Sequence, residues 1–340
     1  MDFIKLLKIN QVELSKYILN YLYKTKAEKY YNIKRINKGG ILVTPKENRK
    51  YPLICVHLDT INDHKSKALP KLNIKGDYIS LASDSPCNCL GGDDRCGVYI
   101  ALSLIKHRIP YGFGFFYDEE IGGVGSGIVS PLINNLDNIT AFIGLDRRGC
   151  DELALYGYDN SELIDLFESK GYFKARGSFT DASNLSSLSD KGLACVNLSV
   201  GYYNEHTLKE TINITAMNRT LKVLKSMVDE LSSKLFLIDN SMIYGGLYGS
   251  ELYYYDDDIY KYDDNIYNYD SDDIYNYDDD DTEELEQWYI EGYNKAMEQG
   301  YEVSKAELSK ENLKGAEPWY ISYINGFKDA IYDMKCCIDF

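Results

Sequence analysis

Short apolar runs of strand length alternate with helical patterns over the first 235 residues or so, and this alternation constrains the fold most strongly. Strands are typical of the runs at 30–36, 41–44, 53–57, 78–82, 112–117, 141–145 and 194–200. Helices are typical of the stretches near 5–24, 95–107, 125–135, 160–170, 182–189 and 213–233. Strands separated by helices predict a three-layer α/β/α domain with a mixed, largely parallel central sheet. The Gly39-Gly40 step between two apolar runs predicts an early hairpin.

Composition divides the 340 residues into three regions. We predict an α/β domain at 1–238, an acidic Tyr/Asp-rich low-complexity linker at 239–286 and a small α-helical module at 287–340. Between Glu251 and Glu286 there are 16 Asp and Glu residues but one Lys, so this tract carries nearly all of the net charge of −16. Like charges at that density repel and bury little core, which predicts a disordered linker. The alternative is a tract that binds a basic partner.

The last region contains an internal sequence repeat. The stretch 289–297 (YIEGYNKAM) aligns with 323–331 (YINGFKDAI) at an offset of 34 residues. Two copies predict a pair of similar helices and are too few for a solenoid. Such a module could hold homo-oligomers together or dock a protein partner.

Several classes of protein are excluded by composition. The chain has no basic stripe, so nothing supports nucleic-acid binding. Its N-terminal stretch has the pattern of an amphipathic helix without the cleavage site of a signal peptide. No stretch approaches the ~18 apolar residues that span a bilayer, so we expect no membrane association. The eight cysteines show no framework spacing, which indicates a cytoplasmic protein with reduced thiols.

Side chains that bind metals follow the predicted strands. They are His57 and Asp59 after 53–57, Asp93 and Asp94 before the helix at 95–107, Glu119 and Glu120 after 112–117, Asp146 after 141–145 and His206 after the last strand. In open α/β sheets ligands collect at the carboxyl ends of the strands, so these side chains are expected to converge.

Imidazole and carboxylate together favour zinc. Two histidines with several carboxylates are too many for one tetrahedral ion but suit two ions that share a carboxylate. Such a pair activates a bridging water and polarises a substrate carbonyl. A spare carboxylate must then carry the proton from that water to the leaving group.

The ordered pattern is His-x-Asp, Gly-x-Asp-Asp-Arg-x-Gly, Asp-Glu-Glu-x-Gly, an Asp at a strand end and a late His. It resembles the di-zinc exopeptidase superfamily, which includes peptidase T, glutamate carboxypeptidases, aminoacylases and zinc aminopeptidases, and it covers nearly all of 1–235. The resemblance implies a metallopeptidase or amidohydrolase that cleaves small peptides or N-acyl amino acids, with 1–238 as its catalytic domain. The intervals 57–93 and 146–206 are too short for the lid domain of many members. The resemblance is therefore to lidless members, and specificity that depends on the lid does not carry over.

The resemblance also implies a role for each motif residue. His57 and Asp146 would bind one Zn²⁺, Glu120 and His206 would bind the other, and Asp93 would bridge the two. The match of His206 is positional only, through the stretch 200–206 (VGYYNEH).

The remaining two site residues would act in catalysis. Glu119 would be the general base and later the general acid. Asp59 would fix the tautomer of His57, as carboxylates behind metal-bound histidines do. The peptide between Asp93 and Asp94 is expected to be cis, as in the family.

Plainer interpretations compete at some positions. Asp93-Asp94 could cap a helix, and the cap and ligand roles could be split between them. Asp146 could pair with the arginines that follow it. The pair at 180–181 (Thr-Asp) lies either near the substrate or at a helix N-cap. Cys87 and Cys89 lack a partner pair, which favours buried thiols over a metal site.

Two other functions remain open. The chain could be a catalytically idle, metal-stabilised scaffold or interaction protein, although a scaffold has no need of a proton carrier such as Glu119. It could also transfer acyl groups, as glutaminyl cyclases do with a single zinc, whereas two ligand sets favour hydrolysis.

Overall fold

The computed structural model describes residues 3–65, 69–239 and 295. Its helices are α1 (Phe3–Leu6), α2 (Gln11–Lys24), the 3-10 helix η1 (Ala27–Lys29), α3 (Ile61–Lys65), α4 (Gly92–Lys106), α5 (Val124–Asn134), α6 (Ser161–Glu168), α7 (Asp181–Ser187), α8 (Ile214–Ser226) and α9 (Val228–Ser232). Its strands are β1 (Tyr31–Ile36), β2 (Gly40–Pro45), β3 (Tyr51–His57), β4 (Leu72–Lys75), β5 (Tyr78–Leu81), β6 (Gly112–Phe116), β7 (Ile139–Arg147), β8 (Glu152–Leu155), β9 (Phe173–Arg176), β10 (Cys195–Ser199), β11 (Tyr202–Tyr203) and β12 (Thr211–Asn213). The predicted linker and helical module lie outside the described residues, so those two predictions stay open.

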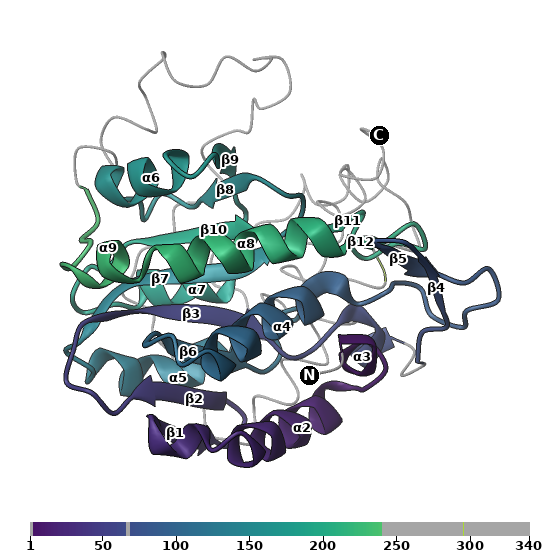
Figure 1. The fold of residues 1–340 in the computed structure, drawn as a ribbon, viewed down its shortest axis with the longest axis horizontal. Helices are drawn as coiled ribbons and strands as arrows, with labels where there is room; N and C mark the ends of the chain where they lie inside the picture. The colour runs from purple at the N-terminus through teal and green to yellow at the C-terminus, as the bar shows by residue number, and fades with distance from the viewer. Residues whose placement is uncertain (1–2, 66–68, 240–294, 296–340) are drawn as a thin grey trace. The chain divides into compact units, whose positions relative to one another are not determined.

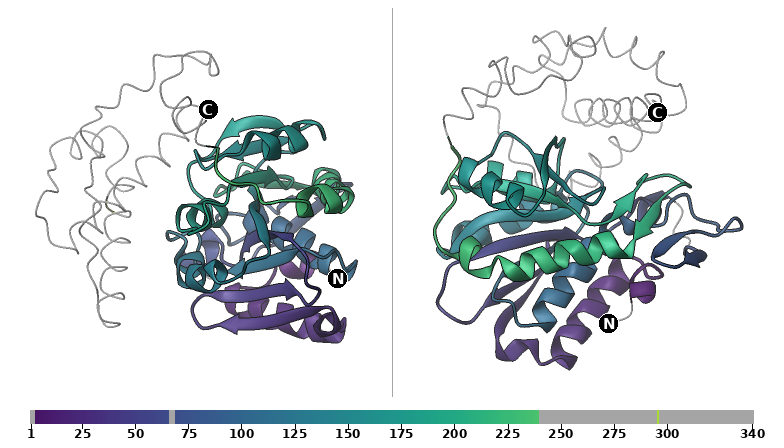
Figure 2. Two further views of the ribbon diagram at one scale, coloured as in Figure 1. Left: turned by 90° about the vertical axis from the view of Figure 1, so that its left-hand side faces the viewer. Right: turned by 45° about the horizontal axis from the view of Figure 1, so that its top comes forward.

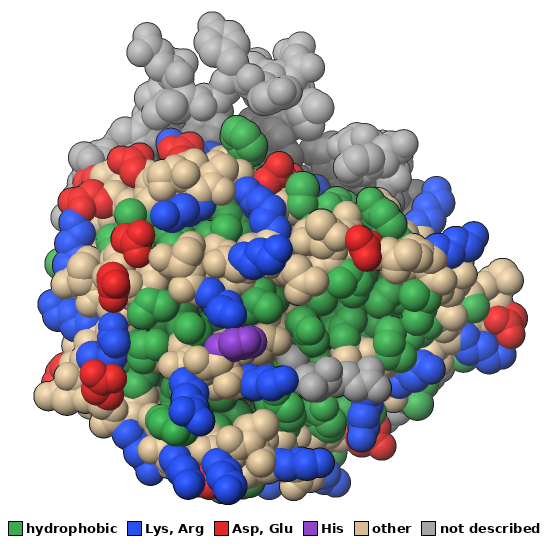
Figure 3. All heavy atoms as spheres, viewed as in Figure 1, with side chains coloured by type: hydrophobic (Ala, Val, Ile, Leu, Met, Phe, Trp, Pro, Cys, Tyr) green, Lys and Arg blue, Asp and Glu red, His purple; other side chains and the backbone are tan. Residues whose placement is uncertain are grey.

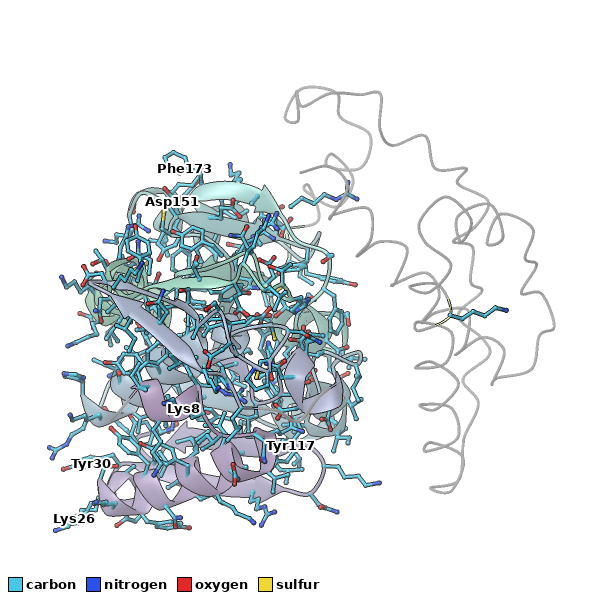
Figure 4. All side chains as sticks on the ribbon, turned by 90° about the vertical axis from the view of Figure 1, so that its right-hand side faces the viewer. Lys8, Lys26, Tyr30, Tyr117, Asp151 and Phe173 are labelled. Carbon is cyan, nitrogen blue, oxygen red and sulfur yellow. The ribbon has the colours of Figure 1, made fainter. Side chains whose placement is uncertain are left out.

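The main sheet has eight strands in the order β1-β2-β6-β3-β7-β10-β8-β9 (Figure 1). The four strands in its centre, β6, β3, β7 and β10, are mutually parallel. Antiparallel pairs join β1 to β2, β2 to β6 and β10 to β8, whereas β8 and β9 are parallel. Tyr30 and Phe173 lie towards opposite edges of this sheet (Figure 4). The prediction of a mixed, largely parallel sheet is confirmed.

Helices cover both faces of the sheet, so the domain has three layers. In β3, Ile54 and Val56 belong to the core beneath α4 and α8, while Leu53 and Cys55 belong to the core beneath α5 and α7. A parallel strand buried on both faces reads as a continuous apolar run, as β3 does. Figure 1 shows α4 and α8 in front of the sheet and α5 and α7 behind it, and Figure 2 shows the same layers from two other sides.

The structure corrects several predicted boundaries. The helix predicted at 5–24 breaks at Asn10, whose side chain accepts a hydrogen bond from Glu13 N and caps α2. The helix predicted at 213–233 divides at Met227 into α8 and α9. The early hairpin is confirmed as β1–β2, but its turn is 37–39, and Gly40 pairs with Ile36. A Cβ at Gly40 would lie 1.9 Å from Phe115 O, so this position requires glycine.

A second, antiparallel sheet has the order β11-β12-β5-β4. It joins the interval after His57, which forms α3, β4 and β5, to the segment that carries His206. Strand β11 packs against α4. The interval between the two motifs therefore holds a hairpin instead of a lid domain, as its length predicted.

The surface of the described domain carries both charged and apolar side chains. Figure 3 shows Lys and Arg side chains dispersed over the α4–α8 face, with apolar areas between them. Ile74 of β4 and Tyr78 of β5 are among the exposed apolar side chains. Within the ranges 3–65 and 69–239, no helix is both long enough and apolar enough to cross a membrane.

Candidate metal centre

Parallel strands bring the candidate ligands to one edge of the sheet. His57 ends β3, Asp146 lies near the end of β7, and Glu119 and Glu120 follow β6. Because β6, β3 and β7 are adjacent and parallel, their carboxyl ends are neighbours. Asp93 enters from the start of α4, and His206 from the loop between β11 and β12, so the expected convergence occurs.

Asp93 lies between the two histidines. Its Oδ1 is 2.9 Å from Nε2 of His57, and its Oδ2 is 3.3 Å from Nε2 of His206. Each oxygen thus faces a different imidazole, which is the arrangement that a carboxylate shared by two cations requires. The peptide between Asp93 and Asp94 is cis, as predicted.

One group of potential ligand atoms surrounds His57. Its Nε2 is 3.5 Å from Oδ1 of Asp146, and His57, Glu119 and Asp146 offer atoms that all lie within 4.8 Å of one another. Two hydroxyls fix Asp146: Thr180 Oγ1 donates to Oδ2 at 3.1 Å, and the Tyr202 hydroxyl donates to Oδ1 at 3.2 Å.

A second group of potential ligand atoms surrounds Glu120. Its Oε2 is 3.0 Å from Nε2 of His206. Asp93, Glu120 and His57 also offer atoms within 4.8 Å of one another. The His206 side chain is 36% exposed whereas that of His57 is 1% exposed, so the His206 side of the centre is the more open one.

Asp59 is fully buried behind this centre. Its Oδ1 is 3.2 Å from Nδ1 of His57, and its two oxygens accept hydrogen bonds from the backbone of Glu119 (3.1 Å) and Glu120 (3.0 Å). An acceptor at Nδ1 keeps the proton there and leaves Nε2 free to bind a cation. One carboxylate therefore orients a histidine and also positions the loop of both glutamates.

No protein-family model matches the sequence, and no curated protein matches it. Solved structures do resemble it in fold. The chain is similar to the aminopeptidase PepT of Bacillus cereus, with a TM-score of 0.52 and 14% identity over 67% of this chain and 96% of that one. It is also similar to a tripeptidase of Staphylococcus aureus, with a TM-score of 0.51 and 13% identity over 66% of this chain and 96% of that one. The chain therefore shares the fold of these two peptidases.

The electrostatics of this site favour a bound cation. Burial raises the pKa of Glu119 well above its usual range, and it raises the pKa of Asp146 to about 7. Burial also raises the pKa of Asp93, but hydrogen bonds from His206 and His57 outweigh this effect and hold its pKa well below its usual value. Buried carboxylates that repel one another are costly unless a cation compensates them. The donor set of imidazole and carboxylate groups fits zinc.

The structure also bears on the plainer interpretations. Asp94 Oδ1 accepts a hydrogen bond from Gly97 N at 2.9 Å, so Asp94 caps the helix, whereas Asp93 faces the histidines. Arg147 pairs with Glu152 at 2.7 Å and Arg148 with Glu205 at 3.2 Å. Within the described part of the chain, Asp146 has no ion pair with either arginine.

The structure also describes the two other uncertain motifs. Thr180 is at the N-cap position of α7, which confirms the cap interpretation, and its hydroxyl donates a hydrogen bond to Asp146. A position near the substrate stays a prediction. Asp181 is the first residue of α7 and is buried. Cys87 and Cys89 are buried, as predicted.

Sequence reasoning missed two residues beside the centre. Arg95 is 2% exposed and donates hydrogen bonds to the backbone oxygens of Leu6, Ile9, Leu58 and Asp59. Its place in the Asp-Asp-Arg motif was the available signal. Glu210 is 1% exposed and accepts hydrogen bonds from the backbone that leads into α4. It has no counterpart among the motifs that the sequence indicated.

Proposed function

We propose that this chain is a two-zinc metallopeptidase that hydrolyses amide bonds of small peptides or N-acyl amino acids. The observation that carries the proposal is the position of Asp93, which offers one oxygen to the His57 group and the other to the His206 group. The zinc exopeptidase fold and the nearby Glu119 support it.

The ligand assignment follows the two groups of atoms. His57 and Asp146 would hold one ion, Glu120 and His206 the other, and Asp93 would contact both. When bound, such ions supply a nucleophilic water at neutral pH and polarise the substrate carbonyl.

Glu119 is the proposed general base and acid. Its carboxylate takes the proton of the attacking water and then delivers it to the nitrogen of the leaving amine. Burial raises its pKa in the metal-free site, which favours the protonated form that the second step requires.

The surrounding side chains hold the reacting groups in place. Asp59 fixes the His57 tautomer and the backbone that carries Glu119. The hydroxyls of Thr180 and Tyr202 restrict rotation of the Asp146 carboxylate. Sites of this kind require geometry that neighbouring groups enforce. Since the eight cysteines show no spacing typical of a disulfide framework, we also propose that the protein works in the cytoplasm.

The test combines metal analysis with a substrate screen on the full-length protein. Dipeptides, aminoacyl reporters and N-acyl amino acids would be offered to wild type, Glu119→Gln and Glu152→Gln. The last variant loses a carboxylate that pairs with Arg147 and contributes no ligand. We expect two zinc equivalents in all three proteins and turnover in all but Glu119→Gln.

The same screen separates the competing functions. Turnover only of substrates with a free amine indicates an aminopeptidase, and turnover only of substrates with a free carboxylate indicates a carboxypeptidase or a deacylase. Binding of less than one zinc equivalent, or undiminished turnover by Glu119→Gln, would refute the proposal. Zinc binding without turnover of any substrate would favour the scaffold.

A further inference from the structure

We infer that Glu210 is a positioning residue for the metal centre, because its buried carboxylate ties the loop that carries His206 to the backbone that carries Asp93. The inference rests on the proposed two-zinc function. It assigns a role to a residue that belongs to neither ligand group and does not contact the reacting atoms.

The carboxylate of Glu210 accepts four backbone hydrogen bonds. Oε2 accepts from Leu90 N at 2.6 Å and from Gly91 N at 3.0 Å, and Oε1 accepts from Gly92 N at 2.6 Å and from Asp93 N at 3.3 Å. With 1% exposure, Glu210 is shielded from water, and hydrogen bonds to a charged acceptor are strong in such surroundings.

The backbone at this point cannot satisfy its own donors. Asp93 and Asp94 have non-helical dihedral angles inside the stretch that begins α4, so the first N–H groups need acceptors from elsewhere. The residue at position 92 also leaves space for this carboxylate. A Cβ at Gly92 would lie 3.0 Å from Glu210 Oε1 and 2.8 Å from a side-chain carbon of Ile212, so glycine leaves the room that Glu210 occupies.

We call the Glu210 carboxylate and its four backbone donors the clamp. The backbone of Glu210 itself is held by the small sheet. Glu210 immediately precedes β12, which pairs with β5 and with β11. Ile212 in β12 is fully buried. His206 lies in the loop between β11 and β12, four residues before Glu210, with a φ of 61°. Ligand and clamp therefore share one short loop, which faces the Asp93 backbone at one point and the Asp93 side chain at another.

The clamp should affect the two proposed zinc sites to different extents. His57 and Asp146 are fixed by adjacent parallel strands of the main sheet, β3 and β7. The distance between His206 and Asp93 depends instead on a loop from the small sheet. The Glu210 side chain links that loop to the backbone of Asp93. Loss of the clamp should therefore weaken the site of Glu120 and His206 and leave the site of His57 and Asp146 close to normal.

The test is calorimetric titration of metal-free, full-length protein with zinc, together with thermal unfolding of the metal-free form. Glu210→Gln keeps the volume but replaces one oxygen by an amide donor that faces two N–H groups. Glu210→Asp keeps the charge but is one carbon shorter, and it serves if the first variant does not fold. Glu205→Gln is the matched control: it removes a charge from the same loop, where Glu205 pairs with Arg148.

We expect two tight equivalents for wild type and Glu205→Gln. Glu210→Gln and Glu210→Asp should keep one tight equivalent and bind the second at least about 10-fold more weakly, the range typical of lost outer-shell partners. Unchanged affinities, or equal weakening of both equivalents, would overturn the inference, because a purely structural role would not single out one site. Wild type that binds fewer than two equivalents would instead refute the proposed function itself.

Discussion

At the scale of single residues, two carboxylates of the candidate metal centre each contact more than one neighbour. Asp93 faces both histidines, and Asp59 reaches His57 and the backbone of two glutamates. Such sharing reduces the number of buried charges that the fold must hold. It also means that one substitution disturbs more than one group.

Asp59→Asn should weaken zinc binding about 10- to 100-fold, because the amide cannot accept at every point where the carboxylate does. The backbone donors of Glu119 and Glu120 would lose one acceptor, and His57 would lose its tautomer control. Competition with a chelator measures the affinity. Asp137→Asn, on an exposed carboxylate that pairs with Lys191, is the control. Equal affinities for Asp59→Asn and wild type would contradict the role given to Asp59.

Asp181 should make the metal-free protein less stable as pH rises. Burial is the main cause that raises the pKa of Asp181 to about 8, and the nearby charges of Asp59 and Asp146 add to it. Ser126 and His57 lower this pKa in part. Among the described residues, neither oxygen of Asp181 has a hydrogen-bond partner that meets ordinary geometry, since the Ser126 hydroxyl donates to Gly123 O.

The sign follows from proton binding. The unfolded carboxyl titrates near ~4, so between about pH 4 and 8 the folded state binds the extra proton and loses stability with rising pH. One proton corresponds to a slope of about 1.4 kcal/mol per pH unit. Asp181→Asn should remove about that much slope in urea unfolding between pH 5 and 7.5 without metal. An unchanged slope would show that Asp181 does not hold the proton.

The candidate site was largely predictable at this scale, because the motif residues differ in type from the apolar runs that precede them. All seven predicted site residues lie together in the structure. Glu210 and Arg95 were missed for a physical reason. Both form hydrogen bonds mainly with backbone groups, and the sequence does not indicate which backbone groups lack a partner. A role of that kind depends on the approach of distant segments.

At the scale of elements, the central strands were predicted well because burial on both faces leaves continuous apolar runs. The short strands β4, β8, β9, β11 and β12 were not predicted, since two to four residues rarely establish a period; of the four-residue strands only β5 was predicted. The exposed edge strand β9 has no buried residue at all. The break before α2 depends on the Asn10 cap, which the apolar pattern across 5–24 obscured.

Gly97 should be essential to the packing of α4. A Cβ there would lie 2.1 Å from Leu145 O and 2.4 Å from Asp94 Oδ1, so the helix would have to move away from β7. Gly97→Ala should cost about 1–3 kcal/mol of unfolding free energy, as overpacked cores do. Gly127→Ala in α5 is the control: its Cβ would meet nothing closer than 3.9 Å, and alanine favours helix. Urea unfolding that ranks the two variants in the opposite order would contradict this packing.

At the scale of the whole molecule, the described domain contains every proposed ligand and both apolar cores. Its last segment is tied down as well: Ile238 N donates to Gly192 O, and Asp239 N donates to Asp159 O, both at 2.8 Å. The acidic tract and the C-terminal module lie beyond this point, and their roles remain predictions from composition.

A chain that ends after Asp239 should keep its melting temperature within a few degrees and its zinc content unchanged. The physical reason is that every described residue of the two cores and of the ligand groups precedes residue 240. Differential scanning calorimetry and metal analysis measure the two quantities. Sedimentation of the same pair tests the predicted module: an unchanged oligomeric state, with unchanged turnover, would refute oligomerisation or docking through 287–340 as a requirement for activity.

The most direct test of the two-metal account is anomalous scattering at the zinc edge from crystals of the zinc-loaded, full-length protein. Two peaks should appear about 3.5–4 Å apart, as in other two-metal sites. One peak should lie within bonding distance of His57 and Asp146 and the other of Glu120 and His206, with Asp93 between them. A single peak, or two peaks without Asp93 as a common ligand, would contradict the account.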